Sequence, residues 1–210
     1  MRIALLTIAL VLAGCASRPA PPSWQPNAKD ALDAFTDDYL RGNTGAANAQ
    51  FARARRETTS TGRADLVAQV ELVRCAVLAA SLEFDGCPGF AALAGDASAQ
   101  QRAYAAYLAG RWDGIDVAAL PEQHRAVVGS GSAAGVADPL AKLVAAGALF
   151  KAGRIAPADI GAATEAASAQ GWRRPLLMWL GVAQQRAQAL GDGAALERIT
   201  RRIALASGQK

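Results

Sequence analysis

The sequence predicts an all-α protein. From Lys29 onward, apolar residues recur every three or four positions, which is typical of amphipathic helices. Glycine or proline separates most of these segments, and these residues commonly mark helix ends and helix starts. No stretch shows the strict alternation of apolar and polar residues that is typical of a half-buried strand.

The first half of the chain is expected to form a pair of helices followed by one stronger helix. Apolar spacing predicts a helix from Lys29 to Gly42 and a second one around Ala47–Ala54. The most regular segment is Arg63 to Phe84, which is apolar on two faces and is therefore expected to pack on two sides. A turn at 87–89 and one helical turn at 90–93 follow it.

The middle of the chain is less regular. A helix is expected over 98–109, with Gly110 as its end, and a weaker pattern predicts another over 117–128. Gly129-Ser130-Gly131-Ser132 is expected to be a flexible loop that acts as a hinge. Asp138-Pro139 then starts a helix that ends at Gly153, since an N-cap followed by proline is a typical helix start.

Three further helices complete the chain. Two are expected to open at Pro157 and Pro175, and the last carries an apolar stripe over 196–206. The stretch Leu176–Val182 is apolar nearly all round. It is either deeply buried or a surface for a partner.

Residues 1–14 have the layout of a secretory signal peptide. Arg2 precedes an apolar run, Ile3–Ala13, that is well short of the ~20 residues a membrane-spanning helix needs. Leu12-Ala13-Gly14-Cys15 resembles the lipobox of bacterial lipoproteins. The resemblance implies that Cys15 becomes the first residue of the mature protein, carries its lipid, and attaches the protein to a membrane facing the periplasm. Ser17 follows in place of the aspartate that retains many enterobacterial lipoproteins in the inner membrane, which favours the inner leaflet of an outer membrane.

Residues 15–28 are expected to be the lipidated cysteine and a tether. Four prolines between Arg18 and Asn27 disfavour helix and strand, so this segment predicts a semi-extended spacer of ~30 Å. Trp24 within it either rests at the membrane interface or docks on the domain.

With Cys15 lipidated, Cys75 and Cys87 remain as a pair. An even number of cysteines in an oxidising compartment suggests a disulfide, whereas the alternative is two small buried thiols. A helix that continued from Cys75 to Phe84 would end ~13.5 Å further along its axis, and three residues span only ~10 Å. The bridge therefore requires that helix to end or bend near 80–82.

The region Leu32–Ala54 resembles a tetratricopeptide repeat. An aromatic residue before a glycine turn is followed by small and aromatic residues on the second helix, at the spacings of that repeat: Tyr39, Gly42, Asn43, Ala47, Phe51 and Ala54. Later copies near 107–112, 150–158 and 191–196 match fewer positions, and their period drifts.

This resemblance implies a degenerate, tetratricopeptide-like, right-handed α-solenoid of helical hairpins. Its two lobes would be a first over 29–128 and a second over 138–207, joined by the Gly/Ser loop 129–137. A generic helical bundle is the alternative.

The sequence shows no recognisable catalytic or metal motif. His124 is the chain's one histidine, has no accompanying cluster of metal ligands, and is expected at the surface. Gly129, Gly131 and Gly135 imitate a dinucleotide-binding loop in spacing only, so no cofactor is expected. The net charge of +4 is mild for an exported chain and does not predict nucleic-acid binding.

The two resemblances together imply a non-catalytic protein-binding scaffold in the cell envelope. By position, the first helices of each pair would line a partner groove with five residues, each of which also fits core packing: Thr36, Tyr39, Tyr104, Tyr107 and Phe150. The alternatives are an envelope enzyme that processes the cell wall or another glycan through an unrecognised carboxylate site, and a purely structural lipoprotein.

Overall fold

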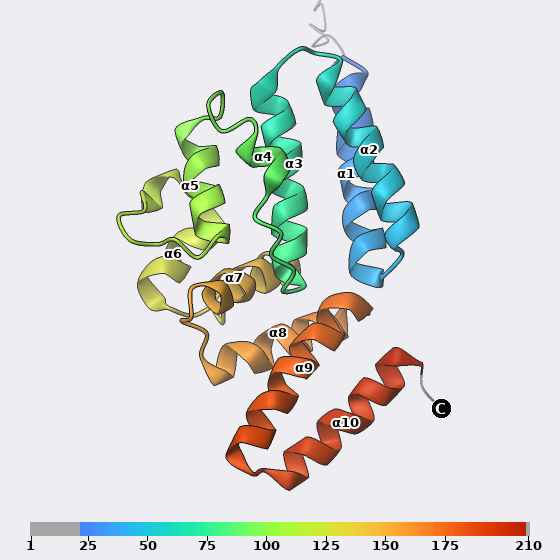
Figure 1. Ribbon diagram of the computed structural model, residues 1–210, viewed down its shortest axis with the longest axis vertical. Helices are drawn as coiled ribbons and strands as arrows, with labels where there is room; N and C mark the ends of the chain where they lie inside the picture. Colours follow the sequence, from blue (N-terminus) through green and yellow to red (C-terminus); the bar gives the residue numbers. More distant parts are fainter. Residues whose placement is uncertain (1–21, 209–210) are drawn as a thin grey trace, which may run out of the picture.

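The computed structural model of the chain describes residues 22–208, and this part is all-α, as the sequence predicts (Figure 1). It contains ten α-helices and one short 3-10 helix, η1 (Val117–Ala119). In chain order the α-helices are α1 (Trp24–Arg41), α2 (Thr44–Thr59), α3 (Ala64–Ala80), α4 (Pro88–Ala91), α5 (Ala99–Leu108), α6 (Glu122–Ser130), α7 (Pro139–Lys151), α8 (Pro157–Ala169), α9 (Arg173–Leu190) and α10 (Gly193–Ser207). Among these, none is long and apolar enough to cross a membrane. The expected signal peptide and Cys15 lie outside the described residues.

Helix α3 lies at the centre of the arrangement. The hairpin of α1 and α2 packs on one side of it, α4 and α5 pack on another, and α7 crosses its C-terminal end (Figure 1). From α7 onward each helix packs on the next, so α8, α9 and α10 continue away from α3. Helix α9 also returns to contact α1, which connects the two halves of the chain.

Helix α1 begins five residues earlier than the sequence predicts, within the expected tether. Pro26 occupies the first turn of α1, where a backbone N–H has no intrahelical partner and a proline is therefore tolerated. Ala28 is already buried and Trp24 is half-buried, so this first turn belongs to the packed domain. The prediction of an extended segment up to Asn27 is wrong for residues 24–27.

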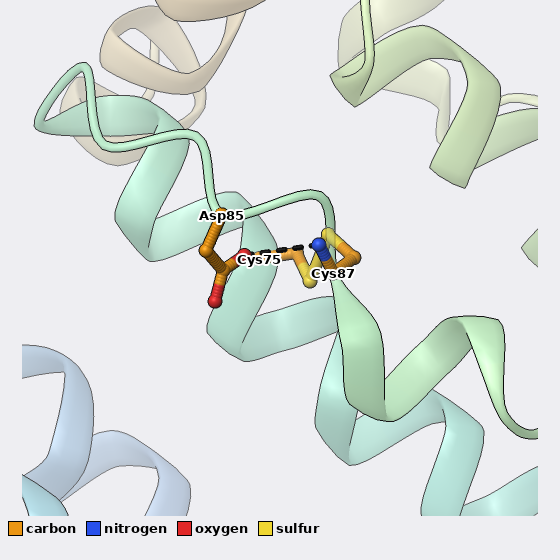
Figure 2. Close-up of side chains that lie close together, drawn as sticks. All are labelled: Cys75, Asp85 and Cys87. Atoms are coloured by element: carbon orange, nitrogen blue, oxygen red, sulfur yellow. Dashed lines mark hydrogen bonds between the residues drawn. A yellow bond between two sulfur atoms is a disulfide. The ribbon is translucent and has the colours of Figure 1, made fainter.

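Helix α3 ends at Ala80, four residues before the predicted end. Leu82 adopts a left-handed conformation with φ of 58°, and the N–H groups of Leu82 and Glu83 donate to carbonyls of the last turn. A bridge between Cys75 and Cys87 requires the helix to end or bend near 80–82, and this early end meets that requirement. The two Cα atoms lie 5.7 Å apart and the sulfurs are joined (Figure 2).

Pro121 divides the helix expected over 117–128. The residue before a proline is pushed out of the helical region, and Leu120 has a ψ of 153°. The chain therefore forms η1, turns, and restarts as α6.

The segment 129–132, which the sequence predicts to be a hinge, is partly helical and is hydrogen-bonded to α8. Helix α6 continues to Ser130, and the buried carboxylate of Asp159 on α8 accepts hydrogen bonds from Ser132 Oγ at 2.8 Å and Ala133 N at 2.9 Å. A single cluster of buried side chains runs from Phe35 to Trp179, so the two predicted lobes share one core.

The C-terminal end of α3 makes a close backbone contact with α7. A Cβ atom at Gly147 on α7 would lie 2.1 Å from the carbonyl oxygen of Ala79, so only glycine permits this crossing. The indole Nε1 of Trp179 on α9 donates to the carbonyl of Ala80 at 3.1 Å. Trp179 and Leu180 are fully buried, Leu176 and Val182 are partly buried against the core, and Met178 is exposed. The apolar stretch at 176–182 therefore packs on the core along one face.

Arg174 joins the start of α9 to the α1–α2 turn. Its guanidinium lies 4.2 Å from the Tyr39 ring centroid, and its Nε donates to the Tyr39 carbonyl at 2.8 Å. The same side chain donates to Thr44 Oγ1 at 2.6 Å and to Glu83 Oε1 at 3.2 Å. One side chain thus connects α1, α2, the loop after α3, and α9.

Replacing Gly147 by alanine is expected to destabilise the fold. The added methyl group meets the Ala79 carbonyl and forces α7 away from α3, which outweighs the better helix propensity of alanine and costs about 2 kcal/mol net. The free energy of unfolding, measured by urea titration, checks this. Gly161→Ala on α8 is the control, because a Cβ there meets nothing within 4 Å, and it should leave stability unchanged or slightly higher. Equal stability of the two variants would contradict the close crossing.

Removing the disulfide by Cys75→Ala combined with Cys87→Ala is expected to lower the free energy of unfolding by about 3 kcal/mol, because the unfolded chain loses its cross-link. Urea titration with and without a reductant measures this. The reductant should destabilise the wild-type chain and leave the double variant unchanged. If the reductant left the free energy of unfolding of the wild-type chain unchanged, Cys75 and Cys87 would be two free thiols.

Candidate binding groove

A cavity of about 570 Å³ opens between α3, α5, the η1–α6 segment and α7. Its floor is apolar and mostly buried, and consists of Leu72, Val73, Ala76, Val77, Leu140 and Val144. Its rim carries amide side chains: Gln69, Gln100, Gln101 and Gln123. We call this feature the groove.

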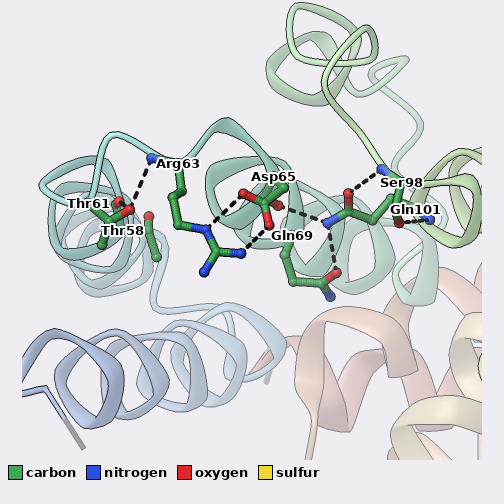
Figure 3. Close-up of polar contacts among 7 residues, drawn as sticks. All are labelled: Thr58, Thr61, Arg63, Asp65, Gln69, Ser98 and Gln101. Atoms are coloured by element: carbon green, nitrogen blue, oxygen red, sulfur yellow. Dashed lines mark hydrogen bonds and ion pairs between the residues drawn. The ribbon is translucent and has the colours of Figure 1, made fainter.

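Capping hydrogen bonds at the starts of α5 and α7 fix two walls of the groove. Ser98 and Gln101 form a capping box at the start of α5, since each side chain bonds the other residue's backbone N–H. Gln101 Nε2 also donates to the carbonyl of Asp65 at 2.8 Å and approaches Gln69 Oε1 at 3.4 Å, which connects α5 to α3 (Figure 3). On the opposite wall, Asp138 caps α7 by accepting from Ala141 N at 2.7 Å.

An aromatic cluster closes one end of the groove. The ring of His124 lies 5.6 Å from that of Tyr104 and 5.1 Å from that of Tyr107, measured between centroids. Tyr107 in turn stacks on Trp112 at 5.2 Å, and the Tyr107 hydroxyl lies 3.4 Å from His124 Nδ1. His124 is 1% exposed, so the prediction of a surface histidine is wrong. Helix α6 starts at Glu122, directly after Pro121, and its buried face carries His124 together with Val127 three residues later.

Arg125 and Asp138 are the charged side chains in the lining of the groove, and its other polar groups are neutral at pH 7. Burial lowers the pKa of His124 to about 4, against a small opposing effect of Asp138, so the imidazole is neutral. Burial also raises the pKa of the Tyr104 and Tyr107 phenols. Arg125 adds one guanidinium, whose Nε donates to the Leu120 carbonyl at 2.9 Å. The groove therefore offers neutral hydrogen-bonding groups above an apolar floor.

Asp138 is the one carboxylate in the lining of the groove. Glycoside hydrolysis commonly uses two carboxyl groups roughly 5–10 Å apart, one of which acts as acid. Asp138 already accepts the backbone N–H of Ala141, which is a helix-capping role.

The five residues predicted for a partner groove do not form one surface. Tyr104 lines the groove and is half-buried, whereas Tyr107 lies fully buried behind it. Tyr39 is buried beneath Arg174, and the Thr36 hydroxyl donates to the Leu32 carbonyl at 2.8 Å. Phe150 is 37% exposed and packs edge-on against Trp179, at 6.1 Å between centroids.

Sequence reasoning missed the glutamines of the rim. Gln69 and Gln100 lie on polar faces of their helices, where their roles depend on which neighbour the fold supplies. The Ser98–Gln101 capping pattern was a readable signal for the start of α5. It did not indicate that α5 would face α3 and α7.

A second cavity, of about 650 Å³, lies beside the disulfide. Its two carboxylates are held by arginines, since Asp85 pairs with Arg74 at 2.7 Å and Glu83 pairs with Arg174. Metal-ligating atoms of Cys75, Asp85 and Cys87 approach within 4.8 Å of one another (Figure 2). The sulfurs are joined to each other, however, and Asp85 also accepts from Cys87 N at 2.9 Å. These contacts fasten the loop after α3.

No protein-family profile, curated protein or solved structure matches this chain.

Acidification is expected to weaken the fold through His124. Its pKa is about 4 in the folded state against 6.5 ordinarily, so between these values the unfolded chain binds a proton that the folded chain does not. The stability that His124 contributes is therefore present above pH 6.5 and falls by about 3 kcal/mol as the pH approaches 4.

The measurement is the free energy of unfolding of wild type and His124→Gln at pH 7 and pH 4.5. The variant should lose less stability on acidification than wild type, because both chains share every other titrating group. An equal loss in the two proteins would contradict a neutral, buried His124.

Proposed function

We propose that this protein is a lipid-anchored periplasmic lipoprotein that acts as a non-catalytic protein-binding scaffold in the cell envelope. The observation that supports protein binding is the groove, with its uncharged amide rim and apolar floor. The observation that supports the envelope location is the lipobox-like Leu12-Ala13-Gly14-Cys15.

The chemistry of the groove suits an extended peptide segment. Each peptide unit presents a donor and an acceptor, and each glutamine amide offers both in return. Gln100 and Gln123 are exposed, and among the described residues their side chains make no hydrogen bond. Apolar side chains of the segment would fill the floor, and the cavity's size lies within the ~300–1,000 Å³ of ordinary ligand sites.

We also propose that the fold is a degenerate, tetratricopeptide-like, right-handed α-solenoid. In support, Gly42 ends α1 in a left-handed conformation with φ of 94°, and the α1–α2 hairpin buries Ala47 and Ala54. Phe35 and Phe51 meet across this hairpin at 5.4 Å between ring centroids. The sequential packing of α7 to α10 is also what a solenoid would give.

The proposal is tested by photo-crosslinking in intact cells. A photoreactive residue at Ala118, which is exposed and lines the groove, should yield one discrete protein adduct, and the same residue at Ala194 on α10 should not. Replacing Gln100 and Gln123 together by alanine should lower the adduct yield about thirtyfold, since each lost hydrogen bond costs roughly 1 kcal/mol and the two together roughly 2 kcal/mol.

The matched control replaces two exposed glutamines of α9, Gln185 and Gln188, by alanine, and the adduct should persist. Melting temperatures of all variants should agree, because these side chains are exposed. An adduct that forms equally well without the rim glutamines would refute the groove as the binding site.

A further inference from the structure

The end of the molecule next to the N-terminal tether carries two unpaired arginines. Helices α1 and α2 form an antiparallel hairpin around Gly42, so the last turns of α2 lie beside the start of α1 (Figure 1). Arg53 and Arg56 project from these turns and are exposed. Within residues 22–208, no ion pair or side-chain hydrogen bond involves either guanidinium.

Neighbouring arginines at this end are already paired, which distinguishes Arg53 and Arg56. Arg55 Nε donates to the buried carboxylate of Glu71 at 2.8 Å. Arg63 is held by Asp65 at 2.7 Å (Figure 3). With three arginines against Glu57, the segment 53–60 carries a net charge of +2. A shallow hollow of about 400 Å³ lies on this face, lined by Ala52, Arg55, Arg56, Thr59 and Ser60.

We propose that this face, with Arg53 and Arg56 at its centre, docks on the headgroups of anionic phospholipids. The inference rests on the lipid anchor at Cys15 that forms part of the proposed function. Nine peptide links join Cys15 to Trp24, and they reach at most about 30 Å. The chain outside the described residues therefore ends at this face and keeps it close to the bilayer that holds the lipid.

Charge complementarity makes the lipid phosphate the partner of this face. A basic residue near an anionic bilayer gains roughly 1 kcal/mol, which is little for a free protein. A short tether raises the effective concentration of the surface to roughly millimolar, so a weak contact becomes well occupied. The arginines then add little to attachment, which the acyl chains provide, and instead set the orientation of the domain.

The proposed orientation determines which parts of the molecule face away from the bilayer. With the C-terminal end of α2 against the headgroups, the turn between α9 and α10 lies at the opposite end of the molecule (Figure 1). The groove, on the walls formed by α3, α5 and α7, then opens to the side.

The test uses the lipidated full chain reconstituted in vesicles that contain a nitroxide-headgroup lipid. A fluorescent residue replaces Ser60 on the proposed face, or Leu190, which is 67% exposed at the far end of α9. At position 60, quenching should be strong in vesicles with 30 mol% phosphatidylglycerol (about a third anionic lipid) and weak in pure phosphatidylcholine, because the attraction needs lipid charge. At position 190 it should be weak in both.

Replacing Arg53 and Arg56 together by glutamine should reduce the docked-to-undocked ratio roughly tenfold or more. Arg198→Gln combined with Arg201→Gln removes the same charge from α10 and should leave quenching at position 60 unchanged. The docking is overturned if quenching at position 60 is equal in anionic and neutral vesicles, or if it is unchanged when Arg53 and Arg56 are replaced.

Flotation of the protein with the vesicles reports the anchor separately. A wild-type chain that floats, next to a Cys15→Ala chain that carries no lipid, supports the anchor on which the docking rests. A wild-type chain without lipid at Cys15 overturns the anchor and the docking together. If a lipidated chain floats and its quenching at position 60 stays the same whether or not anionic lipid, or Arg53 and Arg56, are present, the docking alone is overturned.

Discussion

The contact between α3 and α7 at Ala79 and Gly147 is the constraint on which the rest of the structure depends. Because the glycine has no side chain, the two backbones touch, and the end of α3 becomes accessible to α9 as well. Trp179 then satisfies the carbonyl of Ala80, one of the groups that a helix terminus leaves free. The C-terminal helices are thus attached to the centre of the N-terminal half. An architecture built of local hairpins thereby acquires one shared core.

The groove follows from the same crossing. Helix α7 meets α3 at its C-terminal end and leaves the middle of α3 open to the groove, where Leu72 and Val73 contribute to the floor. The capping box of α5 and the N-cap of α7 are surface features with local hydrogen bonds. They fix the walls, and the amide rim between them is uncharged. An uncharged amide rim with fixed walls is suited to recognise polypeptide backbone, and burial keeps the His124 imidazole at its aromatic end neutral.

Apolar spacing predicted the existence of most helices, because period and helix caps are local properties of the chain. The ends of helices were harder to predict wherever a distant contact decides them. Helix α3 stops at Ala80, where Leu82 adopts a left-handed conformation and the distant Trp179 donates to the free Ala80 carbonyl. Pro26 is tolerated because it falls in a first turn. The early end of α3 was foreseen only through the cysteine pair, where chain length imposed a geometric condition. Site residues such as Gln100 could not be predicted, since no local pattern tells a polar face that lines a groove from one that meets only solvent.

The hydrogen bonds of Arg174 determine how early in synthesis this protein can complete its fold. Its partners lie 135 residues earlier at Tyr39 and 130 residues earlier at Thr44, so they cannot form until the ribosome has made nearly the whole chain. The hairpin of α1 and α2 can assemble early, but it gains its last attachment only from α9. A chain whose closing contacts are so distant in sequence remains incompletely folded during synthesis. If the chain is exported as proposed, it would therefore remain unfolded enough to pass through a translocation channel before it folds on the other side.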